Sequence, residues 1–143
     1  MKPTMTIGLT VLALGLSAAA GTAFAKAAPG AERKNEAGGV TVTATYLGQT
    51  AQAVRFQVKL DTHTADLSQF DLKNSVTLRN DSGAAVRPLD PKALGGHHAE
   101  GELAFPATDS AGRAVVGEST RYLELVVTNV AGIPERVLRW DLR

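Results

Sequence analysis

The stretch Val54-Arg55-Phe56-Gln57-Val58-Lys59-Leu60 alternates apolar and polar side chains at every position. In an extended backbone, successive side chains point to opposite faces of a sheet, so this alternation predicts a strand with one face in a core and the other in water. Six further segments combine strand-forming residues with turn residues between them: 40–47, 75–80, 84–88, 101–106, 121–128 and 136–142. Seven short strands within about a hundred residues favour an all-β, immunoglobulin-like two-sheet β-sandwich over a barrel.

The last of these segments also predicts which of its side chains are buried. Three apolar side chains would face the core: Leu138, Trp140 and Leu142. Arg139 and Asp141 would face water, and we expect both Arg136 and Arg139 on a solvated strand face with local salt bridges. Helical periodicity is missing from the sequence, except that residues 65–72 could form a single helical turn capped by Asp66.

Length, charge and cysteine content exclude several classes of protein. The length of 143 residues is consistent with one domain. The chain has 15 Lys and Arg residues against 14 Asp and Glu residues, and this net charge of +1 produces no long-range electrostatic field that would attract a polyanion. We therefore expect neither nucleic acid nor an anionic membrane surface as a partner. The hydrophobic fraction of 44% is too high for a disordered tail. Because the chain has no cysteine, it cannot contain disulfides, thiolate metal sites or thiol nucleophiles.

Residues 1–25 have the composition of an export signal. Lys2 precedes an uncharged stretch with an apolar centre, which ends in Ala23-Phe24-Ala25, the small-x-small pattern that a signal peptidase requires. The alternative is an uncleaved membrane anchor, but the second half of the stretch consists mainly of Ala, Gly, Ser and Thr. We therefore expect cleavage after Ala25 and an exported protein, periplasmic or extracellular, without stable membrane insertion.

The chain that would follow the signal divides into two parts. Residues 26–39 are rich in charged residues, Gly and Ala and have no bulky apolar side chain, so we interpret them as a flexible leader. Residues 40–143 contain all seven predicted strands and would form the β-sandwich domain, which we expect to be a monomer.

All three histidines lie in predicted connections between strands, close to acidic residues. One cluster is Asp61-Thr62-His63-Thr64-Ala65-Asp66, and the other is Gly95-Gly96-His97-His98-Ala99-Glu100. If consecutive strands are antiparallel, the second, fourth and sixth connections emerge at the same end of the sandwich. The second and fourth contain the histidine clusters, and the sixth contains Asn129 and residues 132–135. This topology predicts that the two histidine clusters converge.

Imidazole and carboxylate groups at one end of a sandwich suit a borderline divalent ion, Zn or Cu(II), which accepts nitrogen and oxygen ligands. The candidate ligands are the ionisable side chains of the two clusters: His63, His97, His98, Asp61, Asp66 and Glu100. Because adjacent residues of an extended backbone point to opposite faces, we expect His63 and one of the two neighbouring histidines, completed by an acid. Three or fewer protein ligands would leave an open coordination position.

The same residues also fit a metal-free interpretation. The histidine pair could be a solvated turn, Asp61 and His63 could hydrogen-bond the backbone of their connection, and Asp66 could be only a cap. The alternative function is then an interaction or scaffold module of the cell envelope, with an envelope protein as its partner. We expect no enzyme, because the sequence has no Gly-x-Ser-x-Gly elbow, phosphate-binding loop or sign of a sugar cleft. A hydrolase would need a perturbed acid or base in a cleft.

Three sequence blocks together resemble a known family. They are Leu60-Asp61-Thr62-His63, the block Gly-Gly-His-His-x-Glu-Gly-x-Leu-x-Phe-Pro at 95–106, and Pro134-Glu135-Arg136-Val137-Leu138-Arg139-Trp140. Over about residues 40–142 the chain resembles a family of small exported prokaryotic domains with no assigned activity, so the resemblance implies no catalytic residue. More loosely, it resembles periplasmic copper-carrier sandwiches. Those begin with His after cleavage, whereas this chain would begin Lys26-Ala27-Ala28.

Overall fold

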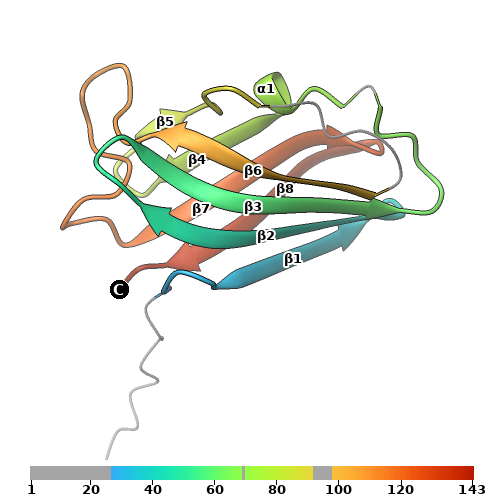
Figure 1. Cartoon of the computed structure of the whole chain (residues 1–143), viewed down its shortest axis with the longest axis horizontal. Coiled ribbons are helices and arrows are strands. Elements are labelled where there is room, and N and C mark those ends of the chain that lie inside the picture. Colours follow the sequence, from blue (N-terminus) through green and yellow to red (C-terminus); the bar gives the residue numbers. More distant parts are fainter. Residues whose placement is uncertain (1–26, 69, 92–97) are drawn as a thin grey trace, which may run out of the picture.

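The alternating segments form two antiparallel sheets in the computed structural model, which describes residues 27–68, 70–91 and 98–143. The first sheet has the order β1-β2-β3-β6, with β1 (Glu32–Ala37), β2 (Val40–Gln49), β3 (Ala53–Thr62) and β6 (His98–Pro106). The second has the order β5-β4-β7-β8, with β4 (Val76–Asn80), β5 (Ala85–Val86), β7 (Tyr122–Val130) and β8 (Ile133–Asp141). The sheets pack face to face (Figure 1), which confirms the predicted two-sheet β-sandwich.

The order of the strands gives the sandwich an immunoglobulin-like connectivity. The chain passes between the sheets from β3 to β4, from β5 to β6 and from β6 to β7. If β2 to β8 are lettered A, B, C, C′, E, F and G, the sheets read A-B-E and C′-C-F-G, and these pairings occur in immunoglobulin domains. The differences are that no D strand is formed by the described residues and that β1 is added beside strand A.

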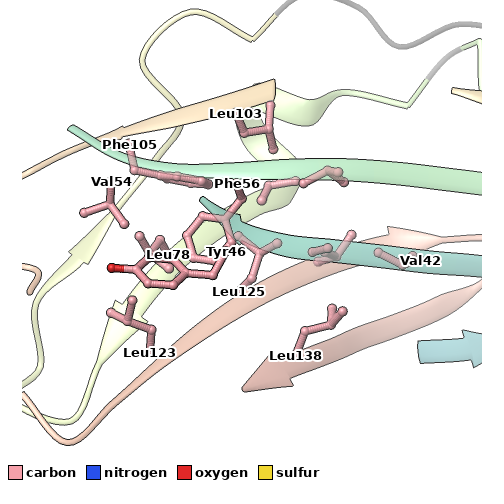
Figure 2. Packing of buried hydrophobic residues seen from close by; sticks show 14 of the residues in the cluster. Val42, Tyr46, Val54, Phe56, Leu78, Leu103, Phe105, Leu123, Leu125 and Leu138 are labelled. Carbon is pink, nitrogen blue, oxygen red and sulfur yellow. The ribbon is translucent and has the colours of Figure 1, made fainter. Parts of the chain in front are cut away.

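An aromatic cluster occupies the centre of the core. The ring of Phe56 lies 5.4 Å from that of Tyr46, 6.0 Å from that of Phe105 and 4.9 Å from that of Trp140, measured between centroids. The rings are tilted or edge-on, and such pairs contribute about 0.5–1.5 kcal/mol each beyond the burial of their surface. Figure 2 shows leucines of the second sheet in the same cluster: Leu78, Leu123, Leu125 and Leu138. The predicted burial of Trp140 is confirmed, and no disulfide is needed beneath it.

The prediction of a flexible leader at 26–39 is wrong for residues 32–37, which form β1 and pair with β2 along their whole length. Their side chains are mainly charged because this is an edge strand, where pairing depends on backbone hydrogen bonds and charges discourage further strand addition. The turn to β2 is Gly38-Gly39, whose φ angles of 55° and 71° fit the two-residue hairpin turn that requires positive φ at both positions. Residues 1–26, which include the predicted signal peptide, lie outside the described residues.

The single helical turn also differs from the prediction. It is α1 (Leu72–Ser75), and its cap is Asp71, whose side chain accepts hydrogen bonds from the backbone N–H groups of Lys73 and Asn74. Asp66 instead accepts from the backbone N–H of Ser68, so it closes a local turn that does not continue into a helix. No helix of the described residues is long and apolar enough to cross a membrane.

Candidate functional site

The structure places two of the three histidines side by side. β3 and β6 are antiparallel neighbours in which Asp61 is opposite His98, so the end of β3 and the start of β6 lie at the same end of the sandwich. His63 follows β3 directly, and its ring centroid is 5.8 Å from that of His98, with an interplanar angle of 78°. The predicted convergence of the two clusters is therefore confirmed for His63 and His98. His97 lies outside the described residues.

Asp61 contacts the second of these histidines directly. Its Oδ1 lies 2.8 Å from Nδ1 of His98, and its Oδ2 lies 3.3 Å from Nζ of Lys59 on the same strand. The hydrogen bond with His98, followed by that with Lys59, holds the pKa of the Asp61 carboxyl below its ordinary value. Asp61 is therefore an ionised hydrogen-bond acceptor at neutral pH.

The two remaining predicted acids have other partners. Glu100 lies on the outer face of β6, opposite Lys59, and accepts a hydrogen bond of 3.0 Å from Nε2 of Gln57. Asp66 lines a separate cavity of about 290 Å³ together with residues that include Asn129. Within the described residues, no group of three or more His, Asp or Glu side chains could hold a metal ion. What the fold brings together is two imidazoles and one carboxylate that already has two partners.

The backbone beneath His63 is held by Thr62, whose side chain is buried at the end of β3. Oγ1 of Thr62 donates to the backbone oxygen of Gly39 at 3.0 Å and accepts from the backbone N–H groups of Thr64 and Ala65, at 3.1 and 2.9 Å. A Cβ at Gly39 would lie 2.6 Å from Oγ1 of Thr64, so the hairpin turn and the His63 loop are in close contact. The threonine turn and this close contact together fix the chain direction at His63.

Arg136 forms the base of this end of the sandwich, and its predicted exposure is wrong. Only 2% of the residue is exposed, and its guanidinium donates to three backbone oxygens, those of Val40 at 2.7 Å, Ala37 at 2.8 Å and Val130 at 3.2 Å. Burial lowers its pKa from the ordinary arginine value. The physical reason is register, because position 136 has the same parity as Leu138 and Trp140, which face the core. Arg139, in contrast, is exposed with ion pairs, as predicted.

The sixth connection does not join the candidate site as predicted. It is reduced to Ala131-Gly132 between β7 and β8, and Glu135 lies within β8, opposite Thr128. A Cβ at Gly38 would lie 2.9 Å from the backbone oxygen of Ala131, so this turn packs against the β1–β2 hairpin. The sixth connection therefore packs against the β1–β2 hairpin at the histidine end of the sandwich, and its residues Ala131 and Gly132 have no ionisable side chain.

Two other hollows are lined by residues other than the two histidines, and one of them reaches Asp61, the hydrogen-bond partner of His98. A shallow depression of about 430 Å³ on the outer face of the first sheet is lined by six residues: Glu32, Lys34, Thr41, Thr43, Lys59 and Asp61. A larger cavity of about 720 Å³ lies at the opposite end of the sandwich, and Tyr46, Glu118 and Leu142 are among its lining residues. Burial raises the pKa of the Tyr46 hydroxyl there. Neither hollow could be predicted from the sequence, because the walls of each combine residues from distant parts of the chain.

Comparison of the chain with protein-family models, with curated proteins and with solved structures finds no match. The resemblance to small exported prokaryotic domains therefore remains a prediction, and the function has to be argued from the site alone.

Proposed function

We propose that this protein is exported and that its β-sandwich binds one divalent transition-metal ion, Zn(II) or Cu(II), at the end that carries His63 and His98. The observation that carries the proposal is the distance of 5.8 Å between the two ring centroids. Imidazole nitrogens bind zinc at about 2.0–2.1 Å, so the centroid of a bound ring lies about 3 Å from the ion, and two rings that share an ion are about 5–6 Å apart. The two imidazoles thus have the separation that a shared ion requires.

The donor types favour these two ions over others. Two imidazoles are borderline ligands that suit Zn(II) and Cu(II), whereas Ca²⁺ and Mg²⁺ prefer a shell of oxygen ligands. A site with two protein ligands leaves further coordination positions for water or a small ligand. We therefore propose a role in binding or delivering the ion, and no catalytic residue is part of the proposal.

Two features support export. The first is the composition of residues 1–25, in which Lys2 precedes an uncharged apolar stretch that ends in the small-x-small pattern Ala23-Phe24-Ala25. The absence of cysteine means that the fold needs no disulfide formation after export.

Export is tested by expressing the full chain with its own N-terminus in a bacterial host and sequencing the N-terminus of the protein recovered outside the cytoplasm. The expected mature chain begins at Lys26. Recovery of the full-length chain in the membrane fraction would overturn this part of the proposal and favour the anchor.

Metal binding is tested on the purified exported protein by calorimetry with Zn(II) and with Cu(II) at neutral pH, together with thermal unfolding. We expect one ion per chain, and at 100 times the dissociation constant a stabilisation of about 2.7 kcal/mol. The substitutions His63→Ala and His98→Ala should each weaken binding at least about tenfold. The matched control is Glu100→Gln, which removes a nearby carboxylate that is bonded to Gln57 and should leave affinity unchanged.

Two results would contradict the metal site. If the wild-type protein binds neither ion, the alternative of a metal-free interaction or scaffold module of the cell envelope becomes the working function. If binding is stoichiometric but unaffected by either histidine substitution, the ion is held elsewhere.

A further inference from the structure

Both oxygens of the Asp61 carboxylate are already in use. Oδ1 is 2.8 Å from Nδ1 of His98, and Oδ2 is 3.3 Å from Nζ of Lys59. The Asp61 side chain is 28% exposed, whereas that of His98 is 64% exposed. The carboxylate thus lies lower on the sheet surface than the imidazole, between the imidazole and the ammonium group.

This contact determines which nitrogen of His98 is free. An ionised carboxylate only accepts hydrogen bonds, so Nδ1 of His98 must carry the proton that it donates. A neutral imidazole has one protonated nitrogen, and Nε2 therefore presents its lone pair. Because Nε2 lies across the ring from Nδ1, the atom that can bind a metal points away from Asp61.

We infer that Asp61 is a positioning residue and not a metal ligand: it holds His98 in the tautomer that binds the ion through Nε2, with His63 as the second ligand. This inference rests on the proposed metal-binding function. A carboxylate that accepts a hydrogen bond from a metal-binding histidine is a recurrent arrangement that orients the ring and increases its basicity. Lys59 has a supporting role, because its ammonium group keeps the carboxylate in place from the other side.

A carboxylate beside a metal-binding histidine can act as a ligand or as a positioning residue, and the two roles of Asp61 require different contacts. As a ligand, Asp61 would have to release the proton donor on His98 and turn an oxygen toward the ion. As a positioning residue, Asp61 keeps its hydrogen bond with Nδ1 of His98, and the ion is bound by two neutral imidazole nitrogens. The chemistry at the ion therefore differs, with two nitrogens and water in one case and an added carboxylate oxygen in the other.

The first experiment measures the His98 tautomer in the metal-free, full-length mature protein by imidazole ¹⁵N NMR at about pH 8, where free imidazole is neutral. We expect the Nδ1–H form in the wild type and a shift toward the Nε2–H form in Asp61→Ala. Asp61→Asn keeps an oxygen that can accept from Nδ1, so it should retain the wild-type tautomer. A wild-type His98 in the Nε2–H form would overturn the inference without bearing on whether a metal binds.

The second experiment measures Cu(II) affinity and the electron paramagnetic resonance spectrum of the bound ion. Asp61→Ala should lose about 10–100-fold in affinity, while Asp61→Asn loses less and keeps the wild-type coupling to two imidazole nitrogens. Glu100→Gln is again the control and should match the wild type. Equal losses in Asp61→Asn and Asp61→Ala, with a changed spectrum in both, would make Asp61 a ligand and overturn the inference while the proposed function stands. Absence of Cu(II) and Zn(II) binding by the wild type would overturn the proposed function itself.

Discussion

At the end of the sandwich that carries His63 and His98, a buried arginine holds the turns, whereas at the opposite end a buried asparagine does so. Arg136 donates to three backbone oxygens, those of Ala37, Val40 and Val130. Asn80 donates from Nδ2 to the backbone oxygens of Ala114 and Val115 and accepts at Oδ1 from the backbone N–H groups of Ser82 and Ala84. Both side chains form hydrogen bonds with backbone groups at or near the turns that end the strands.

The difference lies in what each side chain can bond. A guanidinium only donates, in a fixed planar fork, so Arg136 ties together oxygens from β1, β2 and β7 and holds two hairpins against each other. An amide both donates and accepts, so Asn80 closes its own turn and also holds the long connection after β6. At the arginine end the two hairpins are held together close to the exposed imidazoles of His63 and His98. The asparagine end borders the cavity of about 720 Å³. The two ends therefore differ in the kind of side chain that holds their turns.

The largest effect is expected from Arg136→Met. The substitution fills much of the volume but removes three hydrogen bonds to backbone oxygens, two of them buried, so the free energy of unfolding should fall by about 3 kcal/mol. Urea denaturation measures this loss. The matched control is Arg139→Met on the same strand, where the exposed side chain forms ion pairs with Asp141 and Glu124 and the loss should stay below about 1 kcal/mol. Equal losses in the two variants would contradict a special role for the buried guanidinium.

Asn80→Ala should have the next largest effect, a loss of about 2 kcal/mol, because the amide bonds backbone groups on both sides of the turn. The effect should be local, so hydrogen exchange should accelerate at the amides of Ser82 and Ala84 and remain unchanged at that of Ala65 near His63. Acceleration at both ends would show that the two ends are not independent.

From the sequence, the approach of His63 to His98 could be predicted, but the burial of Arg136 beneath them could not. Strand alternation and antiparallel parity were enough to bring His63 and His98 together, because the direction of each strand decides at which end its loops emerge. The same parity places position 136 on the core face, where it is buried, although a charged side chain on a strand is expected to be exposed. Burial of an arginine depends on carbonyls from distant strands, and no local pattern in the sequence reports them.

The strand β1 was not predicted for a related reason. An edge strand made of charged residues has no apolar periodicity, and β1 is held by its pairing with β2 and by a hydrogen bond from Nε of Arg33 to the backbone oxygen of Arg139. The hydrogen bond between Asp61 and His98 could likewise not be predicted from the sequence, because it depends on the register of β3 and β6. In the observed register His98 lies opposite Asp61, and Glu100 does not. A shift of one residue would have turned the ring to the other face of the sheet.

A smaller effect is expected from two threonines that close turns at opposite ends. Thr62 makes three hydrogen bonds near His63, and Oγ1 of Thr120 accepts one from the backbone N–H of Gly117 at 2.8 Å. Both residues are buried, and replacement of either by valine keeps the shape while removing these bonds, so each should cost about 1–2 kcal/mol, with Thr62→Val the larger. Only Thr62→Val should also weaken Cu(II) binding, measured by calorimetry. A similar loss of affinity in Thr120→Val would contradict the assignment of the site to the histidine end.

The smallest effect concerns Asp109, at the asparagine end, and is a dependence on pH. Oδ1 of Asp109 accepts from the backbone N–H groups of Ala111 and Arg113, each at 2.9 Å, and Oδ2 pairs with the Arg113 guanidinium at 2.7 Å. The backbone hydrogen bond from Arg113, followed by its side-chain hydrogen bond, lowers the pKa of this carboxyl in the folded state. A lowered folded-state pKa stabilises the fold above the ordinary carboxyl pKa of about 4, and this contribution is lost as pH falls through the folded-state value.

Asp109→Asn should therefore be less stable than the wild type at about pH 7, and the difference should shrink as the pH is lowered below about 4. The neutral amide retains an oxygen for the backbone N–H groups, so the variant loses only the ion pair with the exposed Arg113 guanidinium, and the effect should stay small. Urea midpoints measured between about pH 7 and pH 3 test this convergence. Glu118→Gln is the control, because this exposed carboxylate at the same end forms no hydrogen bond or ion pair with the described residues. The urea midpoints of this variant should match those of the wild type at each pH. A difference between Asp109→Asn and the wild type that stays constant with pH would mean that the charge of Asp109 contributes nothing to the free energy of unfolding.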